Sequence, residues 1–265
     1  MDEAQKLTVW RITGAGQSNA EDMVVSEFAL TISFNNQDLV TLLCSPTRLR
    51  QLAIGFLHSE GLVKGKEDLK KVVADEKRGL VWVETHDGRD ADRGVLLRRV
   101  ITSGCGSGPF LQGIADLHHE MRVESGLTIS PDDVFGLVHQ FQDYSDLHRA
   151  THGIHSAALC DAGRILVFSD DIGRHNAIDK VVGECLLSEI PTHDRVMVIS
   201  GRVSSEMLLK VARKGIPVLV SISAPTDLGV KLANDLGITL IGLVRGKRMN
   251  VYSGRWRVRS DERRT

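Results

Sequence analysis

Residues 195–223, RVMVISGRVSSEMLLKVARKGIPVLVSIS, decide the fold class of this chain. The runs over 195–200 and 217–223 are continuously apolar, which is typical of strands that are buried on both faces. Between them, residues 204–215 place their apolar side chains on one helical face, and Gly215 ends the predicted helix. A strand, a helix and a second strand in this order predict a parallel strand pair with a crossover helix.

The same alternation extends along the second half of the chain. Downstream, residues 225–237 predict a helix, and residues 238–245 and 249–254 predict two further strands. Upstream, residues 155–170 indicate a hairpin of two strands, and residues 171–187 indicate a helix. This half is therefore predicted to be α/β, with a largely parallel sheet and helices on both faces.

The first half has a different pattern. Apolar and polar residues alternate in places over 25–45, and Asn35-Asn36 interrupts the run as a hairpin turn does. A short amphipathic helix follows over 45–63, and residues 80–102 indicate two more strands. We predict that this half is α+β with mostly antiparallel pairing.

Local sequence features set the ends of that first helix. Ser45 is the expected N-cap, Pro46 suits the first helical position, and Gly61 is the expected stop. The change of pattern along the chain then predicts two domains. These are a smaller α+β domain over residues 1–127 and an α/β domain over residues 128–265.

The composition is that of an ordinary soluble protein. The 265 residues are 42% hydrophobic and 25% charged, with a formal net charge of -1. A charge so close to zero argues against a nucleic-acid-binding surface spread over the whole protein. Residues 1–10 carry acids and no long apolar core, so we expect neither a signal peptide nor a membrane span and predict a cytoplasmic protein.

The cysteines are too widely spaced for a CxxC motif, so free thiols are expected. Cys105 stands apart because it lies in TSGCGSGPF, residues 102–110, where side chains are nearly absent. The glycines give access to another molecule, which a thiolate nucleophile needs together with a positive local field. The alternative is a surface turn with an incidental cysteine. Cys44, Cys160 and Cys185 lie in apolar segments, where packing is the expected role.

A first polar segment, SDDIGRHNAIDK over residues 169–180, joins a predicted strand to a predicted helix. Asp170 and Asp171 are candidate helix caps. The polar side chains in the first turns of the helix are Arg174, His175, Asn176 and Lys180. Cations at a helix N-terminus oppose the helix dipole, which indicates an anionic ligand nearby. The alternative is a solvated first turn with pairing between Asp and Arg.

A second polar segment is ISGRVSSEM, residues 199–207, where a buried strand leads into a helix. Ligands of open α/β sheets bind at the carboxyl ends of strands, so Arg202, Ser204 and Ser205 are candidates to hold phosphate. The pattern is not GxxxxGK[ST], so nucleotide hydrolysis is not predicted. The alternative is that Ser204 only caps the helix, with Glu206 nearby.

A third polar segment is LVRGKRMN, residues 243–250, in which Arg245, Lys247 and Arg248 surround Gly246. Such a basic turn can hold a pyrophosphate, because guanidinium groups make paired hydrogen bonds with phosphate oxygens. The alternative is a charged hairpin turn at the surface.

Three histidines, His148, His152 and His155, have a spacing that suggests a metal site. No acid or cysteine completes the ligand set in an obvious way, and Gly153 interrupts the helix. We therefore predict no metal site, and His155 is instead a candidate for the ligand pocket.

Taken together, six segments resemble the FdhD family of formate dehydrogenase accessory sulfurtransferases. In chain order they are TSGCG (102–106), THGIHSAAL (151–159), DIGRHNAIDK (171–180), ISGRVSSEM (199–207), SISAPTDLGVKLA (221–233) and LIGLVRGKRMNVYSG (240–254). GRHNAIDK and GRVSSEM are the most specific, and the resemblance extends over residues 20–255.

The resemblance implies a sulfur carrier protein with sulfurtransferase activity. Family members accept a persulfide sulfur from a cysteine desulfurase and pass it to molybdenum or tungsten held by two molybdopterin guanine dinucleotides. The cofactor is then inserted into formate dehydrogenase. The resemblance implies these two protein partners and a GDP-like nucleotide moiety in the bound cofactor. We expect a homodimer, with no nucleic acid or membrane partner.

The resemblance also implies a cytidine deaminase-like C-terminal domain, with a mixed sheet flanked by helices. The chain lacks the H-x-E and P-C-x-x-C zinc motifs of deaminases, which argues against base deamination.

Individual residues follow from the resemblance. Cys105 matches the cysteine that carries the persulfide. The segment that matches the molybdenum-cofactor site consists of Leu243, Val244, Arg245, Gly246, Lys247 and Arg248. Many members carry C-G-x-C-G, whereas this chain has Gly108 at the second cysteine position. Either Cys105 alone suffices, or sulfur transfer is altered or lost in this member.

Two rival functions remain at the level of the sequence. One is a non-catalytic chaperone that only holds the molybdenum cofactor for formate dehydrogenase. The other is a nucleotide-binding enzyme of the deaminase type, which would need bound zinc.

Overall fold

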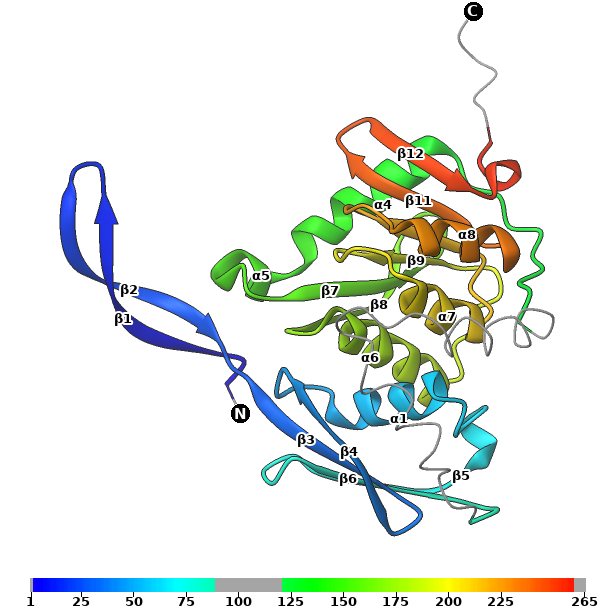
Figure 1. The fold of residues 1–265 in the computed structure, drawn as a ribbon, viewed down its shortest axis with the longest axis horizontal. Helices are drawn as coiled ribbons and strands as arrows, with labels where there is room; N and C mark the ends of the chain where they lie inside the picture. Colours follow the sequence, from blue (N-terminus) through cyan, green and yellow to red (C-terminus); the bar gives the residue numbers. More distant parts are fainter. Residues whose placement is uncertain (1, 89–120, 260–265) are drawn as a thin grey trace, which may run out of the picture.

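The computed structural model describes residues 2–88 and 121–259, whose strands form three sheets (Figure 1). The strands are β1 (Ala4–Thr13), β2 (Gly16–Val25), β3 (Phe28–Phe34), β4 (Gln37–Cys44), β5 (Leu69–Asp75), β6 (Leu80–Thr85), β7 (His155–Cys160), β8 (Ile165–Asp171), β9 (Val196–Ile199), β10 (Val218–Ser221), β11 (Thr239–Arg245) and β12 (Arg248–Ser253). The α-helices are α1 (Leu49–Ser59), α4 (Pro131–Tyr144), α5 (Asp146–Thr151), α6 (Arg174–Leu187), α7 (Ser205–Arg213) and α8 (Asp227–Asp235). Within these residues, no helix is both long enough and apolar enough to cross a membrane.

The four-stranded sheet, called the smaller sheet below, has the order β4-β3-β6-β5. Its outer pairs are antiparallel, and β3 and β6 are parallel, which confirms the mostly antiparallel pairing predicted for this half. Alternate residues of β3 and β6, including Leu30, Ile32, Val81 and Val83, are buried in the core that also contains the apolar face of α1.

The six-stranded sheet, called the larger sheet below, has the order β12-β11-β10-β9-β7-β8. The central strands β9, β10 and β11 are parallel, but β7, β8 and β12 join through antiparallel pairs. The sheet is therefore mixed rather than largely parallel, because the hairpins β7–β8 and β11–β12 add antiparallel strands to its flanks. The predicted α/β class and the mixed sheet flanked by helices are confirmed.

Helices cover both faces of the larger sheet. Helix α4 packs on one face, over a core that includes Val138 and Val220. Helices α6, α7 and α8 cover the other face, and α1 lies between α6 and the smaller sheet (Figure 1). The main core draws on residues 30–83, on Val123 and on residues 157–240. The predicted division of the chain into residues 1–127 and 128–265 stays a prediction.

Two glycines let α1 and α6 approach each other closely. A Cβ at Gly55 would lie 1.8 Å from the carbonyl oxygen of Asp179. A Cβ at Gly183 would lie 1.9 Å from the carbonyl oxygen of Gln51. No side chain fits at either position, so backbone meets backbone where these helices pack.

The predicted start of α1 was wrong. The N-cap is Arg48, in the left-handed conformation with φ 53°, and not Ser45. Ser45 instead contacts the start of the α6 region: its N–H donates to Asp171 Oδ2, and its hydroxyl accepts from the N–H of Ile172. The hydroxyl oxygen that would cap the helix therefore accepts from Ile172 instead. Gly61 follows the helix with φ 79°, in line with the predicted stop.

The hairpin of β1 and β2 has no counterpart in the sequence-based prediction. Its strands pair along their whole length and extend away from the two larger sheets (Figure 1). Trp10 and Ile12 near its turn are 60% and 66% exposed. Polar residues occupy both faces of the ribbon, so the alternation that identifies a half-buried strand is weak here.

Candidate functional site at one edge of the larger sheet

The three polar segments follow strands that end at the same edge of the larger sheet. Strands β8, β9, β10 and β11 all run in one direction, as their pairings with β7 and with one another require. The segments that leave their carboxyl ends therefore come together at one side (Figure 1). This is the usual location of ligand sites in open α/β sheets.

Arg174, His155 and Gly201 are in contact at this edge. A Cβ at Gly201 would lie 3.0 Å from Cβ of Arg174 and 3.5 Å from Nδ1 of His155, so glycine leaves the room that Arg174 occupies. Ser200 Oγ is 3.4 Å from Nδ1 of the same imidazole. Burial lowers the pKa of His155, and the charge of Arg174 lowers that pKa further. His155 is thus held neutral in a positively charged surrounding.

Two helices begin at this edge without a side-chain cap. Helix α6 starts at Arg174 after Gly173, and α7 starts after Ser204. Ser204 occupies the N-cap position, but its hydroxyl accepts no capping hydrogen bond, which rules out the plain capping role. Asp171 does not cap α6 either, because its Oδ1 accepts from the N–H of Gly173 within the preceding turn. Such helix starts favour an anion.

Two buried polar atoms at these helix starts have neither a hydrogen-bond partner nor an ion-pair contact within residues 2–88 and 121–259. They are Nε of Arg174 and Oγ of Ser204. Buried polar groups in proteins are nearly always paired, so these two are candidates for contact with a ligand.

The other predicted residues of the first two segments differ in their surroundings. Arg202 is exposed. His175 Nε2 lies 3.1 Å from Oε2 of Glu206 and joins α6 to α7. The amide of Asn176 donates to the carbonyl of Leu43 and to Oδ1 of Asp171, so its donors hold β4 against α6.

The third segment forms the β11–β12 hairpin. A β-bulge lies between Gly242 and Arg245, and Leu243 within it has φ 55°. Val244 is 1% exposed and packs in the core beneath α4, so only its backbone could contact a cofactor. The residues exposed at the turn are Arg245, Gly246, Lys247 and Arg248.

Backbone contacts link this hairpin to the other segments. The N–H of Leu243 donates to the carbonyl of Ser223, and Pro225 bridges to Val203, next to Ser204. The basic turn and the start of α7 therefore belong to one connected edge.

A buried ion pair supports the same edge, and sequence analysis missed it. Lys180 Nζ lies 2.7 Å from Asp171 Oδ2, and both side chains are 0% exposed. Nζ also donates to the carbonyls of Ser45 and Asp170. Lys180 therefore does not face a ligand, contrary to its grouping with the cations of the first helical turns. Lys180 lies between Ile178 and Val181, which are both buried. This apolar neighbourhood is the sequence signal that could have indicated a buried lysine.

The cysteines outside the predicted loop are buried as expected. Burial is the main cause that raises the pKa of Cys44, Cys160 and Cys185 to about 12, so these thiols are unreactive at neutral pH. Cys105 lies outside the described residues. In the part of the chain that the structure describes, no group of three His, Cys, Asp or Glu side chains could hold a metal ion.

Comparisons with known proteins identify the family. A model of the FdhD/NarQ family matches residues 25–259. The chain belongs to the FdhD/NarQ family. This confirms the resemblance carried by the six segments.

Curated FdhD/NarQ relatives span nearly the whole chain. The sulfur carrier protein FdhD of Bacillus subtilis (strain 168) is 40% identical over 251 residues, covering 95% of this chain and 96% of the relative. The sulfur carrier protein FdhD of Geobacillus kaustophilus is 40% identical over 238 residues, covering 90% of each chain.

A solved structure shares the fold of this FdhD/NarQ member. It is a crystal structure of a proposed formate dehydrogenase accessory protein from Desulfotalea psychrophila. It matches with a TM-score of 0.80 and 24% identity, covering 97% of this chain and 100% of that one. At this identity the likeness shows the fold alone.

Proposed function

We propose that this protein carries sulfur on Cys105 from a cysteine desulfurase to the molybdenum of a bis(molybdopterin guanine dinucleotide) cofactor. The loaded cofactor is then delivered to formate dehydrogenase. The observation that carries the proposal is the cluster of basic and unpartnered polar groups at one edge of the larger sheet. The relatives named sulfur carrier proteins support the sulfur step.

The chemistry of the first step balances without another reactant. The thiolate of Cys105 attacks the terminal sulfur of the desulfurase persulfide, a new S–S bond forms, and the donor cysteine leaves as a thiolate. In the second step the S–S bond on Cys105 breaks, and Cys105 returns to the thiolate. Taking up the sulfur as sulfide needs two electrons, which a thiol reductant or the reduced metal supplies.

The sheet edge is suited to the phosphates of the dinucleotides. The exposed turn offers Arg245, Lys247 and Arg248, and α6 and α7 offer helix N-termini that no side chain among the described residues caps. Guanidinium groups bind phosphate oxygens in pairs, which fixes the orientation of the cargo as well as its charge. The neutral His155 beside Arg174 adds a hydrogen-bonding group without adding charge.

The sulfur step is tested with mass spectrometry after incubation with a cysteine desulfurase and cysteine. The peptide that contains Cys105 should gain about 32 Da, the mass of one sulfur atom. Cys105→Ala should abolish the gain and the maturation of formate dehydrogenase. Cys160→Ala is the matched control, because the thiol of Cys160 is buried and its pKa is raised to about 12 by burial. Full formate dehydrogenase activity with Cys105→Ala would refute the carrier role.

The cargo site is tested with GDP by calorimetry. Arg245→Ala and Arg248→Ala should each weaken GDP binding about tenfold, because a hydrogen bond to a charged group contributes ~1.5 kcal/mol or more. Arg164→Ala is the control, since Arg164 is an exposed arginine in the β7–β8 turn at the opposite end of β8. Unchanged GDP affinity in both site variants counts against the assignment.

The cofactor chaperone is the second candidate function, and Gly108 in place of a second cysteine is the observation that favours it. The two tests separate these functions. A chaperone binds GDP through the same arginines but takes up no sulfur on Cys105.

A further inference from the structure

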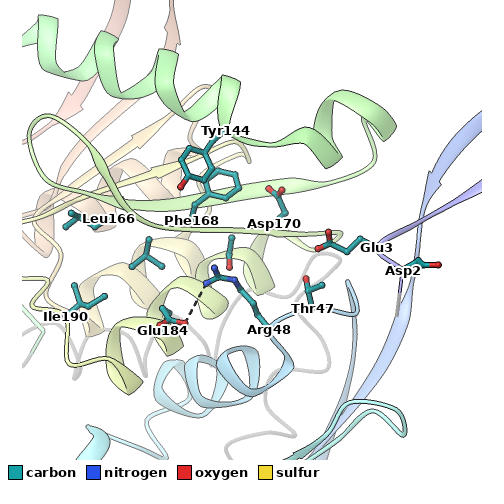
Figure 2. Close-up of a pocket in the computed structure, with 12 residues that line it drawn as sticks. Asp2, Glu3, Thr47, Arg48, Tyr144, Leu166, Phe168, Asp170, Glu184 and Ile190 are labelled. Carbon is teal, nitrogen blue, oxygen red and sulfur yellow. Dashed lines mark ion pairs between the residues drawn. The ribbon is translucent and has the colours of Figure 1, made fainter.

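A groove runs along the outer edge of β8, on the far side of the larger sheet from β12 (Figure 2). Among the described residues β8 pairs only with β7, so its other edge has no strand beside it. The groove has a volume of about 790 Å³. Its lining comes from the start of the chain, the start of α1, the end of α4, β8 itself, and Glu184 and Ile190.

The register of β7 shows which backbone groups of β8 face the groove. The N–H of Ser156 donates to Ser200 Oγ, and its carbonyl accepts from the N–H of Ser200, so both groups point toward β9. Backbone groups alternate in direction along a strand, so Ala158 also points toward β9. Phe168 is paired with Ala158, and its N–H and C=O therefore point away from β7.

Asp170, two residues further along β8, agrees with this register. Its carbonyl accepts from Lys180 Nζ rather than from β7, which closes that end of the edge. The open part is the short stretch around Leu166 and Phe168. An unpaired edge of this kind is a template for another strand.

The side chains of the groove define what that strand should carry. Among the described residues, its charged lining groups are the acids Asp2, Glu3, Asp170 and Glu184 and the base Arg48, which lies 3.7 Å from Glu184. Both carboxylate oxygens of Asp170 already accept from serine hydroxyls, so Asp2, Glu3 and Glu184 are the acids available to a ligand. Figure 2 shows Glu3 and Asp170 at one end and Arg48 with Glu184 at the other. The groove therefore has an excess of negative charge and favours a cationic segment.

The groove also has an aromatic wall and an unsatisfied hydroxyl. The rings of Tyr144 and Phe168 lie 4.5 Å apart, and Tyr144 is 56% exposed, so apolar contact area is available there. Ser169 lines the groove, is 2% exposed, and its Oγ has no partner among the described residues. This buried hydroxyl without a hydrogen bond lies directly beside the open part of the β8 edge.

We infer that the open edge of β8 binds an extended, positively charged segment of a partner protein as an added strand. Backbone hydrogen bonds to Phe168 supply the affinity, and the acidic lining with the aromatic wall selects lysine or arginine alternating with apolar residues. This inference does not depend on the proposed function. It concerns the side of β8 that lacks a neighbouring strand, whereas the proposed function rests on the basic groups at the carboxyl ends of the strands.

The probe is a labelled synthetic nonapeptide of alternating lysine and valine, measured by fluorescence anisotropy against a glutamate–valine peptide. The lysine peptide should bind, and the glutamate peptide should bind at least tenfold more weakly. Equal affinity for the two peptides would overturn the inference. Amide exchange over residues 165–171 should slow when the lysine peptide binds, and protection confined to another region would also overturn it.

Backbone pairing is tested by comparing Phe168→Pro with Phe168→Val. Both remove the ring, but only proline removes the N–H that faces the groove. Phe168→Pro should bind the lysine peptide at least tenfold more weakly than Phe168→Val, and equal binding excludes strand addition. If Phe168→Pro does not fold, a lysine peptide N-methylated at alternate residues replaces it, and unchanged affinity of that peptide likewise excludes strand addition.

Charge selection is tested by Glu184→Gln. This change should weaken the lysine peptide several-fold and reduce the salt dependence of binding, because it also frees Arg48 from its ion pair. Glu76→Gln makes the same change in net charge at an exposed residue outside the groove and should leave affinity unchanged. Equal effects of the two variants would overturn the charge argument.

Light scattering tests whether a second copy of this chain occupies the edge. A dimer that Phe168→Pro dissociates would show that it does, and this result would contradict binding of a separate partner.

Discussion

At the scale of the residue, the ion pair of Lys180 and Asp171 stabilises the edge of the larger sheet where the candidate site lies. The carboxylate accepts from the backbone N–H of Ser45, and both side chains of the pair are fully buried. The pair thereby joins the start of the α1 region to the end of β8. A charge removed on one side would leave the other buried and unpaired.

Lys180→Met should therefore lower the free energy of unfolding by about 3–5 kcal/mol, the range for breaking one side of a buried ion pair. Urea unfolding followed by circular dichroism measures this. Lys66→Met is the matched control, since Lys66 pairs with Glu189 at 2.6 Å with both side chains largely exposed. It should cost less than about 1 kcal/mol. Similar losses for the two variants would contradict the role of burial.

The sequence was sufficient for some residues of the site and not for others. Burial of Cys44, Cys160 and Cys185 followed from their apolar neighbours, and Arg174 and Ser204 were identified from the strand-to-helix pattern. The roles of Ser45 and Lys180 were not, because each is set by contacts with a segment more than a hundred residues away or by the complete burial of a charge. Local pattern carries no information about such contacts.

At the scale of the element, the closeness of α1 and α6 depends on Gly55 and Gly183. Each lies where a methyl group would overlap a backbone carbonyl of the other helix. Neither helix can move outward without also moving the sheet on which it packs. The contact therefore sets the spacing between the smaller sheet and the helices on the larger one.

Gly183→Ala should lower the free energy of unfolding by more than about 3 kcal/mol, because overpacking against rigid backbone exceeds the usual cost of a tight core substitution. Thermal and urea unfolding measure the change. Gly136→Ala in α4 is the matched control, since nothing lies within 4 Å of the added methyl group. It should stabilise the protein by about 0.5–1 kcal/mol through helix propensity. A stable Gly183→Ala protein would show that the helices can separate.

Most elements of the larger sheet could be predicted because continuous apolar strands and helices ending in glycine follow one another from residue 195 to residue 245. The direction of the flanking strands could not, because a strand sequence does not say which neighbour it joins. The hairpin β1–β2 and strand β5 were missed because their exposed residues weaken the alternation.

At the scale of the whole molecule, the hairpin β1–β2 is separate from the layers that form the core. The family match begins at residue 25, where β2 ends, and neither hairpin strand contributes a residue to the two buried cores. Among the described residues, β2 contacts α5, and Val25 at the base of the hairpin lies beside Gly153. The core of the protein does not need it.

Removal of residues 1–24 should therefore change the free energy of unfolding by less than about 1 kcal/mol, since little apolar surface is uncovered. Removal of residues 255–265 is the comparison, because it takes away Arg257, a buried side chain that donates to the carbonyls of Gly237 and Val123. Although this deletion is shorter, it should lower the free energy of unfolding, measured with urea, more than the removal of residues 1–24 does. The opposite order would show that the hairpin belongs to the folding unit.

The placement of α1 has a consequence for how the gene can be divided. One segment of polypeptide supplies α1 and the smaller sheet, another supplies α6, and the two meet through closely packed backbone rather than through the covalent link between them. If the chain were cut after residue 88, the contact between α1 and α6 should keep the two pieces associated as a heterodimer. When the two fragments are expressed from separate reading frames, they should associate as two subunits do, because the main hydrophobic core contains residues from both.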